Sequence, residues 1–295
     1  MTREASLRWT VLVDGPQPGA VNMARDVALA RAVSDAVEET PGAGRTTSGE
    51  QSGRAGGDDS LAAFLRFYAW SRPTLSFGRN EPARERFDPE TLEAAGVDVV
   101  RRPTGGRAVL HDREVTYSIA VPASALGGPR ETYRLVNDAL AAALATLGAN
   151  VSLAGDADAL TPDAGPCFDR PAAGEVVARG RKLVGSAQAR TGKALLQHGS
   201  ILLHDDQVRI PELLREGVEI PGAGPAGRPV ALVELVDTVP EPSRVAMVVA
   251  REMARALPGR WPPGGRPSAE GGWGPYARAV GIEPEFRSPT WTWRR

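Results

Sequence analysis

The feature that most constrains the fold is a series of short strand-like runs that are separated by turns of two or three residues. In the middle of the chain, residues 97–102, 107–111 and 114–122 are rich in apolar and β-branched side chains. Thr104-Gly105-Gly106 and His111-Asp112-Arg113 interrupt these runs, and breaks of this composition are typical of turns. Further strands are expected at residues 7–13, 62–70, 73–79, 175–178, 182–190 and 194–203. The second and third of these are expected to pair, and the last three to form an antiparallel meander.

Apolar residues at helical spacing separate these strands. Helices are expected at residues 22–40, 88–96, 131–147, 210–217 and 242–257, with Asn22 as the N-cap of the first. Trp291 and Trp293 alternate with Thr and Arg, which predicts an edge strand near the end of the chain. Strands joined by short turns and interspersed with helices favour an α+β domain around a largely antiparallel or mixed β-sheet flanked by helices.

Composition excludes some classes of partner. The 295 residues hold 35 Lys and Arg against 36 Asp and Glu, so the basic surplus that a nucleic-acid-binding protein uses to neutralise phosphates is missing. No apolar run approaches the roughly 20 residues that span a bilayer, and the first residues lack the apolar core of a signal peptide. We therefore expect a cytoplasmic protein with neither a nucleic acid nor a membrane as its partner.

Two segments differ in composition from the rest. Residues 38–60 are rich in Gly, Ser, Thr and charged residues and nearly lack large apolar side chains, so a flexible surface insertion is expected there. Residues 258–295 begin with a Pro- and Gly-rich stretch and are expected to form a C-terminal extension that packs on the same domain.

Cys167 is the only cysteine, and it stands in a Gly- and Pro-rich segment that is expected to be a loop. One thiol and three histidines make no disulfide and a poor zinc site, so no metal is expected. A loop thiol can act as a nucleophile, although a lone cysteine is also often a small buried apolar residue. Only two of the 35 basic residues are lysines, Lys182 and Lys193, and lysine, unlike arginine, can release its proton.

Other residues with chemical potential lie near the turns. Thr104, Gly105 and Gly106, followed by Arg107, offer backbone N–H groups and a cation that suit a carbonyl or a phosphate, but a plain hairpin turn with a solvated arginine has the same composition. Lys182 can stabilise a thiolate or polarise a carbonyl, or can simply be a solvated turn lysine. His198 is either a strand-borne imidazole near the site or a hydrogen-bonded core histidine.

The order of these motifs resembles the lipoate-protein ligase/octanoyltransferase family, whose fold is related to biotin protein ligases and class II aminoacyl-tRNA synthetases. The resemblance rests on residues 101–112 (RRPTGGRAVLHD), 165–171 (GPCFDRP), 180–188 (GRKLVGSAQ) and 196–203 (LQHGSILL). The segments 14–29 and 65–79 are also similar to this family. The resemblance covers roughly residues 7 to 210 and implies a catalytic domain over residues 1–257.

Within the family, the sequence is most similar to octanoyl-[acyl carrier protein]:protein octanoyltransferases of the LipM type. This resemblance implies that Cys167 takes an octanoyl group from acyl carrier protein as a thioester. Cys167 then passes the group to a lysine of a lipoyl carrier domain, on the glycine-cleavage protein GcvH or a 2-oxoacid dehydrogenase E2 subunit. Lys182 matches the site lysine of the family, and no cofactor is required.

The resemblance places substrate-binding residues on the three other motifs. They are Arg102, Thr104, Gly105, Gly106, Arg107, Ala108, His111, Gly185, Ser186, Ala187, Gln188, His198 and Gly199. Lys182 and the N–H groups of the Thr104–Gly106 turn are candidates for oxyanion donors, and Lys182 or His198 for the base. The strands at residues 97–100, 107–110 and 182–187 are expected to line an apolar tunnel for the octanoyl chain.

Three alternatives remain open at this point. An ATP-dependent lipoate ligase would use Lys182 to bind an acyl-adenylate, with Mg²⁺ and ATP as cofactors and Cys167 incidental. An amidotransferase would move octanoyl between two carrier domains, and a non-catalytic protein would only bind them. Against the ligase, Arg107 stands where many ligases have a third glycine, and little sequence follows Leu257.

Overall fold

The structure is a computed structural model, and it describes residues 6–40, 60–155, 172–218, 228–268, 274 and 276–294. Its centre is a five-stranded sheet in the order β1-β2-β6-β11-β10. The strands are β1 (Leu7–Val13), β2 (Leu61–Tyr68), β6 (Glu114–Pro122), β11 (Ala194–Leu202) and β10 (Val184–Thr191). β1 and β2 are parallel and the other pairs are antiparallel, which confirms the mixed sheet and the α+β class.

Two small sheets adjoin the central one. The first has the order β4-β3-β5, with β3 parallel to β4 and antiparallel to β5. The second, β7-β8-β9, is antiparallel. Their strands are β3 (Thr74–Phe77), β4 (Asp98–Arg101), β5 (Val109–His111), β7 (Ser152–Leu153), β8 (Val176–Ala178) and β9 (Arg181–Lys182).

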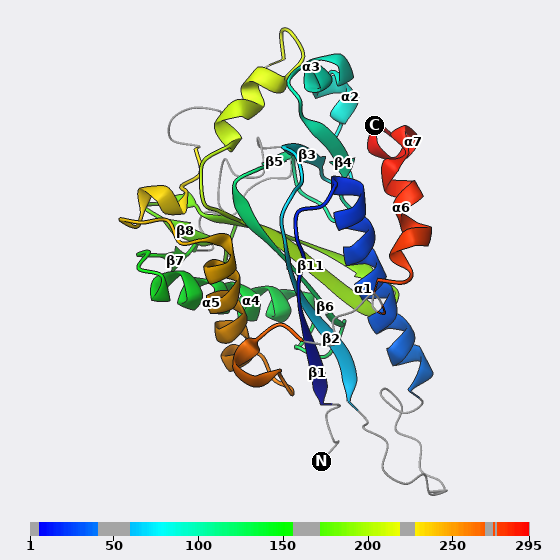
Figure 1. Cartoon of the computed structure of the whole chain (residues 1–295), viewed down its shortest axis with the longest axis vertical. Helices are drawn as coiled ribbons and strands as arrows, with labels where there is room; N and C mark the ends of the chain where they lie inside the picture. Colours follow the sequence, from blue (N-terminus) through cyan, green and yellow to red (C-terminus); the bar gives the residue numbers. More distant parts are fainter. Residues whose placement is uncertain are drawn as a thin grey trace, which may run out of the picture.

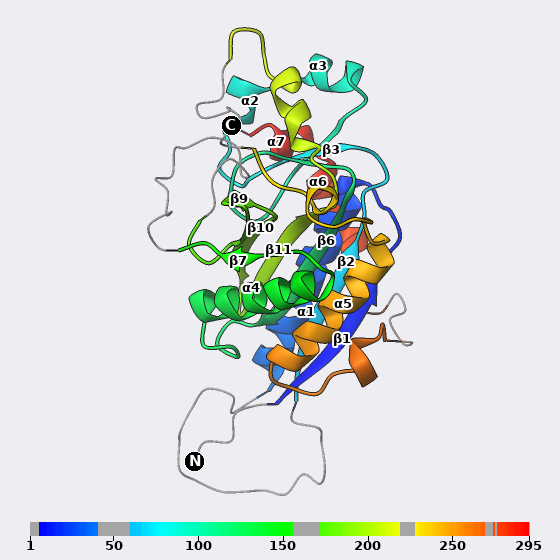
Figure 2. The same cartoon turned by 90° about the vertical axis from the view of Figure 1, so that its left-hand side faces the viewer.

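Helices cover both faces of the central sheet (Figures 1 and 2). On one face, α1 (Gly19–Glu39) packs on the sheet and α6 (Ala279–Arg287) packs on α1. On the other face lie α4 (Pro129–Thr146) and α5 (Pro242–Ala256). The short helices are α2 (Ala83–Arg86), α3 (Pro89–Ala94) and α7 (Pro289–Thr292), and the 3-10 segments are Gln207–Leu213, Leu232–Glu234 and Pro263–Gly265. In the described part of the chain, every helix is too short or too polar to span a bilayer.

The expected pairing of residues 62–70 with 73–79 is wrong. β2 has β1 on one side and β6 on the other, so neither of its edges is free to pair with β3. The expected meander is also divided, because β9 pairs with β8 whereas β10 pairs with β11. Strand positions follow from local sequence, but the choice of partner depends on distant segments.

Three local expectations also need correction. Asn22 does not cap α1, which begins at Gly19, and its side chain is instead buried in the first turns. The helix expected at residues 210–217 is the 3-10 segment Gln207–Leu213, which contains Pro211. Trp291 and Trp293 do not form an edge strand: Trp291 lies in α7 and Trp293 caps that helix. Of the expected insertion, residues 38 and 39 end α1, and residues 41–59 lie outside the described residues.

The described residues after 257 contact the rest of the domain at several points. Trp261 stacks on Trp9 with ring centroids 4.2 Å apart. The Trp291 indole N–H donates to the Arg101 carbonyl, and the Arg101 guanidinium donates to the Thr292 carbonyl. Phe286 of α6 is buried in the cluster that includes α1. The C-terminal segment therefore contributes to the apolar packing on both faces of the central sheet.

This packing predicts that Phe286→Ala lowers the free energy of unfolding by about 3 kcal/mol, because it leaves a cavity against α1. Val280→Ala is the matched control, since Val280 lies on the same helix and is 74% exposed; its effect should stay within about 0.5 kcal/mol. Chemical denaturation of both variants measures the difference. Equal stability of the two variants would contradict the packing of this helix on the domain.

Candidate active site

A pocket opens where β5 and the adjoining loop meet the central sheet. The space between its lining side chains is about 380 Å³, the solvent at its mouth included. The lining residues are Met23, Tyr68, Trp70, Arg102, Val109, His111, Thr116, Gly185, Ser186, Ala187, His198, Gly199 and Ser200. The pocket thus brings together seven of the expected substrate-binding residues: Arg102, His111, Gly185, Ser186, Ala187, His198 and Gly199.

The expected lining strands contribute unequally. Residues 107–110 supply Val109 and residues 182–187 supply the segment from Gly185 to Ala187, but residues 97–100 are absent from the described lining. The sheet order β4-β3-β5 explains this correction. β5 lies on the pocket side of β3 and β4 on the other side, so the valines of β4 pack into other parts of the core.

The turn from Thr104 to Arg107 is held close to the end of β3. Gly106 has a φ of 94°, which favours glycine. A Cβ built on Gly78 would come within 1.7 Å of the Gly106 carbonyl oxygen, so only glycine fits at position 78. The Arg79 N–H donates to the Thr104 carbonyl at 2.8 Å.

Arg102 and Arg107 have different environments. The buried Arg102 guanidinium donates to the carbonyls of Gly105 (3.2 Å) and Arg107 (2.8 Å), so it stabilises the turn from its buried side. The Arg107 side chain extends the other way, to 3.9 Å from the Glu81 carboxylate. Burial raises the pKa of Glu81, against the lowering effect of the nearby arginines. The expected cation beside the turn is therefore paired with a buried acid.

His198 of β11 bridges α1 and the turn. Its Nδ1 lies 3.0 Å from Asp26 Oδ2, and its Nε2 lies 2.6 Å from the Thr104 hydroxyl. Burial alone would raise the pKa of Asp26, but the Arg66 guanidinium and His198 hold it below its usual value. Burial lowers the pKa of His198, and the contact with Asp26 opposes this only in part.

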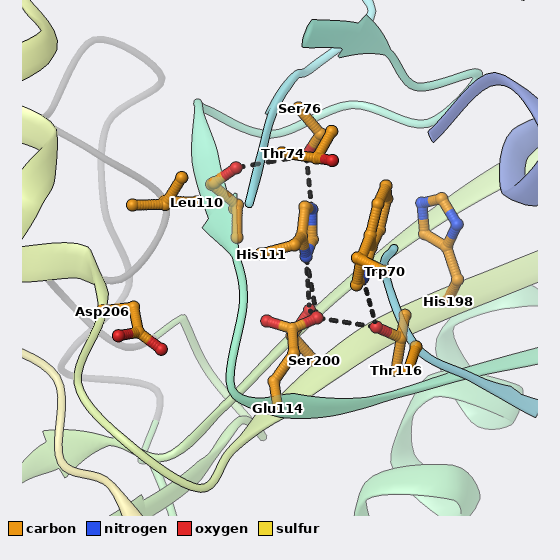
Figure 3. Close-up of polar contacts among 12 residues, drawn as sticks. Trp70, Thr74, Ser76, Leu110, His111, Glu114, Thr116, His198, Ser200 and Asp206 are labelled. Carbon is orange, nitrogen blue, oxygen red and sulfur yellow. Dashed lines mark hydrogen bonds and ion pairs between the residues drawn. The ribbon is translucent and has the colours of Figure 1, made fainter. Parts of the chain in front are cut away.

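His111 occupies a similar network on the other side of the pocket (Figure 3). Its Nε2 lies 2.6 Å from the Ser76 hydroxyl and its Nδ1 lies 2.8 Å from the Glu114 carboxylate. Its ring stacks on Trp70, with centroids 4.0 Å apart. Burial alone would raise the pKa of Glu114, but His111 and two hydroxyl donors, Thr116 and Ser200, hold it below its usual value.

Lys182 is buried and fixed by a carboxylate. Its Nζ lies 2.7 Å from Glu175 Oε1, and both side chains are nearly inaccessible to solvent. Glu175 also accepts from the Tyr133 hydroxyl at 3.2 Å and from the Ala172 N–H at 2.7 Å. Cys167 lies outside the described residues, five positions before Ala172. The lysine is thus an oriented ammonium in a protein interior, unlike a solvated turn lysine.

Residues 20–255 match the Lipoyl protein ligase A/B catalytic domain. The chain belongs to this family. Octanoyltransferase LipM of Kyrpidia tusciae is 42% identical over 216 residues, which cover 68% of this chain and 77% of that protein. Octanoyltransferase LipM of Symbiobacterium thermophilum is 37% identical, over 71% of each chain.

Solved structures share the family fold. Lipoate-protein ligase A bound with ATP has a TM-score of 0.69 at 20% identity, over 98% of each chain. A lipoate protein ligase from T. acidophilum with bound lipoic acid has a TM-score of 0.65 at 20% identity, over 98% of this chain and 99% of that one. At this identity the likeness concerns the fold alone, and it agrees with the mixed sheet flanked by helices.

The remaining residues expected from the family lie beside the pocket. A Cβ on Gly199 would come within 2.4 Å of the Gly185 carbonyl oxygen, so the two strands approach closely only with glycine there. The Gln188 amide donates to Gln197 and to the Pro129 carbonyl. The other expected site residues in the described part of the chain are not among those that line the pocket: Thr104, Gly105, Gly106, Arg107, Ala108, Lys182 and Gln188.

Sequence reasoning missed the carboxylates that orient the site, Asp26, Glu114 and Glu175, and the pocket walls Met23, Tyr68, Trp70 and Ser200. One signal was available for Asp26. It stands between the apolar positions Met23, Val27 and Ala30 that define the buried face of α1, and a charge on such a face needs a partner. Within the described ranges no group of three or more His, Cys, Asp or Glu residues can hold a metal ion.

The buried pair predicts a pH-dependent stability. Because the folded-state pKa of Asp26 lies below its unfolded value, its stabilising effect is present above the unfolded pKa and is lost as the pH falls through the folded pKa. Asp26→Asn should therefore lower the free energy of unfolding by about 3 kcal/mol at pH 7, because it removes a carboxylate that pairs with the fully buried Arg66 and that lies 3.0 Å from His198 Nδ1. The loss should shrink below about pH 4.

Ser118→Ala is the matched control, because it removes one neutral donor to the same carboxylate, at 2.7 Å. Its cost should be about 1 kcal/mol. Denaturant titrations from pH 3 to pH 8 compare the two variants with the wild type. A loss for Asp26→Asn that does not change with pH would contradict an ionised Asp26.

Proposed function

We propose that this chain is an octanoyltransferase of protein lipoylation, which transfers octanoyl from acyl carrier protein to a lysine of a lipoyl carrier domain through a Cys167 thioester. The observation that carries the proposal is the 42% identity to Octanoyltransferase LipM of Kyrpidia tusciae over 77% of that protein. Cys167 is the only thiol of the chain. The acceptor belongs to GcvH or to a 2-oxoacid dehydrogenase E2 subunit.

The pocket supports an acyl substrate. Met23, Val109 and Ala187 supply aliphatic walls, and the ring of Trp70 forms another. The ring nitrogens of His111 and His198 are engaged in hydrogen bonds within the protein, so these side chains need no polar partner from an octanoyl chain.

The chemistry has two balanced steps. The Cys167 thiolate attacks the carbonyl carbon of the donor thioester; a new C–S bond forms, the bond to phosphopantetheine breaks, and its sulfur takes up a proton. The neutral lysine amine of the acceptor then attacks the acyl-enzyme; an amide bond forms, the bond to Cys167 breaks, and the proton that the amine loses is taken up by the released Cys167 thiolate. The second step is downhill, because an amide is more stable than a thioester, so the transfer needs no ATP.

Each step develops negative charge on the carbonyl oxygen. The Lys182 ammonium is suited to stabilise it, because Glu175 orients its Nζ at 2.7 Å in a buried environment where a charge acts strongly. Backbone N–H groups of the Thr104–Gly106 turn are the second set of donors.

The thioester predicts a covalent adduct without ATP. When the protein is mixed with octanoyl-acyl carrier protein, intact-protein mass spectrometry should find one octanoyl group that hydroxylamine removes and that maps to Cys167. Cys167→Ser should form no hydroxylamine-labile adduct while it keeps the wild-type circular dichroism spectrum. Labelling of a lipoyl domain by free octanoate or lipoate that requires ATP, with full activity in Cys167→Ser, would instead establish an ATP-dependent ligase.

The role of Lys182 predicts that Lys182→Arg lowers the rate of adduct formation by about 10²-fold or more, since arginine keeps the charge but not the reach and geometry of the ammonium. Lys193→Arg is the matched control, because Lys193 is the only other lysine and is exposed. Quenched-flow mass spectrometry measures both rates. Equal rates for the two variants would exclude Lys182 from the transfer.

A further inference from the structure

Two buried carboxylate–histidine pairs lie on either side of the pocket, and hydrogen bonds connect both to the turn from Thr104 to Arg107. His198 bonds to Thr104 directly, and His111 is connected through Ser76 and Arg102. We infer that His198 is a positioning residue: Asp26 fixes the proton on Nδ1, and Nε2 then holds the Thr104 hydroxyl and with it the turn whose N–H groups are the proposed oxyanion donors. This inference rests on the proposed function and assigns His198 a role other than that of the base.

The hydrogen-bond partners of Asp26 fix the proton on His198. Asp26 Oδ1 accepts from Arg66 and from Ser118, each at 2.7 Å, and Oδ2 accepts from Tyr68 at 2.9 Å. The Asp26 pKa lies below its usual value, so its carboxylate is ionised and has no proton to offer. The nitrogen that lies 3.0 Å from Oδ2, Nδ1 of His198, must therefore carry the hydrogen.

The other imidazole nitrogen is then an acceptor. A neutral imidazole with a proton on Nδ1 has a lone pair on Nε2, and the Thr104 hydroxyl lies 2.6 Å from it. His198 is only 4% exposed, and burial disfavours its charged form. The groups that face this ring, besides Asp26, include Arg102 and His111. Both nitrogens are thus occupied, and the ring has no free site with which to take a proton from an incoming amine.

The carbonyls of the turn point into the protein. The Thr104 carbonyl accepts from the Arg79 N–H, and the Gly105 and Arg107 carbonyls accept from Arg102. In a trans peptide the N–H points away from the C=O of the same unit. The N–H groups of Gly105 and Gly106 therefore point away from Arg79 and Arg102, and neither has an acceptor within the part of the chain that the structure describes. Two such donors side by side suit a developing oxyanion.

A second set of hydrogen bonds, which includes His111, still holds the turn when the bond between His198 and Thr104 is removed. His111 bonds to Ser76, and the Arg102 guanidinium bonds to the carbonyl of Ser76 at 2.7 Å as well as to the turn. Removal of the Thr104 hydroxyl alone therefore loosens the turn on one side without releasing it. This makes Thr104→Val a clean test, because valine has the shape of threonine and lacks only the hydroxyl.

The test combines NMR and kinetics. In ¹⁵N-labelled protein, the His198 resonances, assigned by comparison with His198→Gln, should show a protonated Nδ1 and an unprotonated Nε2 near pH 7. Thr104→Val should lower kcat for octanoyl transfer between about tenfold and a hundredfold, with KM for octanoyl-acyl carrier protein within about twofold. Thr104→Ser should restore the rate.

Thr132→Val is the control, because Thr132 is also buried and its hydroxyl bonds within α4, to the Gly128 carbonyl; its kcat should match the wild type. A proton on Nε2 of His198, or a wild-type rate in Thr104→Val, would overturn the inference. If the wild type forms no adduct, the proposed transfer reaction fails, and the same variants are then compared in ATP-dependent ligation. The tautomer of His198 is decided by NMR in either case.

Discussion

A fully buried guanidinium, that of Arg66, connects α1 to the central sheet, and much of the site depends on it. Arg66 stands in the middle of β2 and donates to Asp14, to the Asn22 carbonyl and side chain, and to Asp26. A guanidinium without solvent contact is costly unless all its donors are satisfied. The requirement to satisfy them fixes the rotation of α1 on the sheet, and this rotation brings the Asp26 carboxylate to His198.

The pocket forms where two sheets meet at a glycine contact. Gly78, which follows β3, lies against Gly106, so the turn can approach β3. Arg102 donates hydrogen bonds both to the turn and to Ser76 of β3. Buried carboxylates orient each polar side chain of the site: Asp26 acts on His198, Glu114 on His111 and Glu175 on Lys182. Each of these three side chains is thus held in place by a charge that is itself buried.

The sequence predicted individual elements well and their associations poorly. The strands at residues 114–122 and 194–203 were identifiable because each is an apolar run that ends at a turn, and β6 (Glu114–Pro122) and β11 (Ala194–Leu202) confirm them. The pairing of β2 with β3 was wrong because β1 and β6 occupy both edges of β2. The edge strand at Trp291 was wrong because Pro289 begins a helix there and the indole finds its acceptor on Arg101.

By itself, the sequence determined the α+β class, the family and the identity of the residues with chemical potential, because each of these is encoded in local patterns and in the order of motifs. The tertiary structure alone decided which of those residues meet. Asp26 and His198 are 172 positions apart, and the turn at Thr104 joins them only because α1, β11 and the β3–β5 sheet pack together. The protonation of a buried group depends on the partners that packing supplies, and no local pattern in the sequence contains that information.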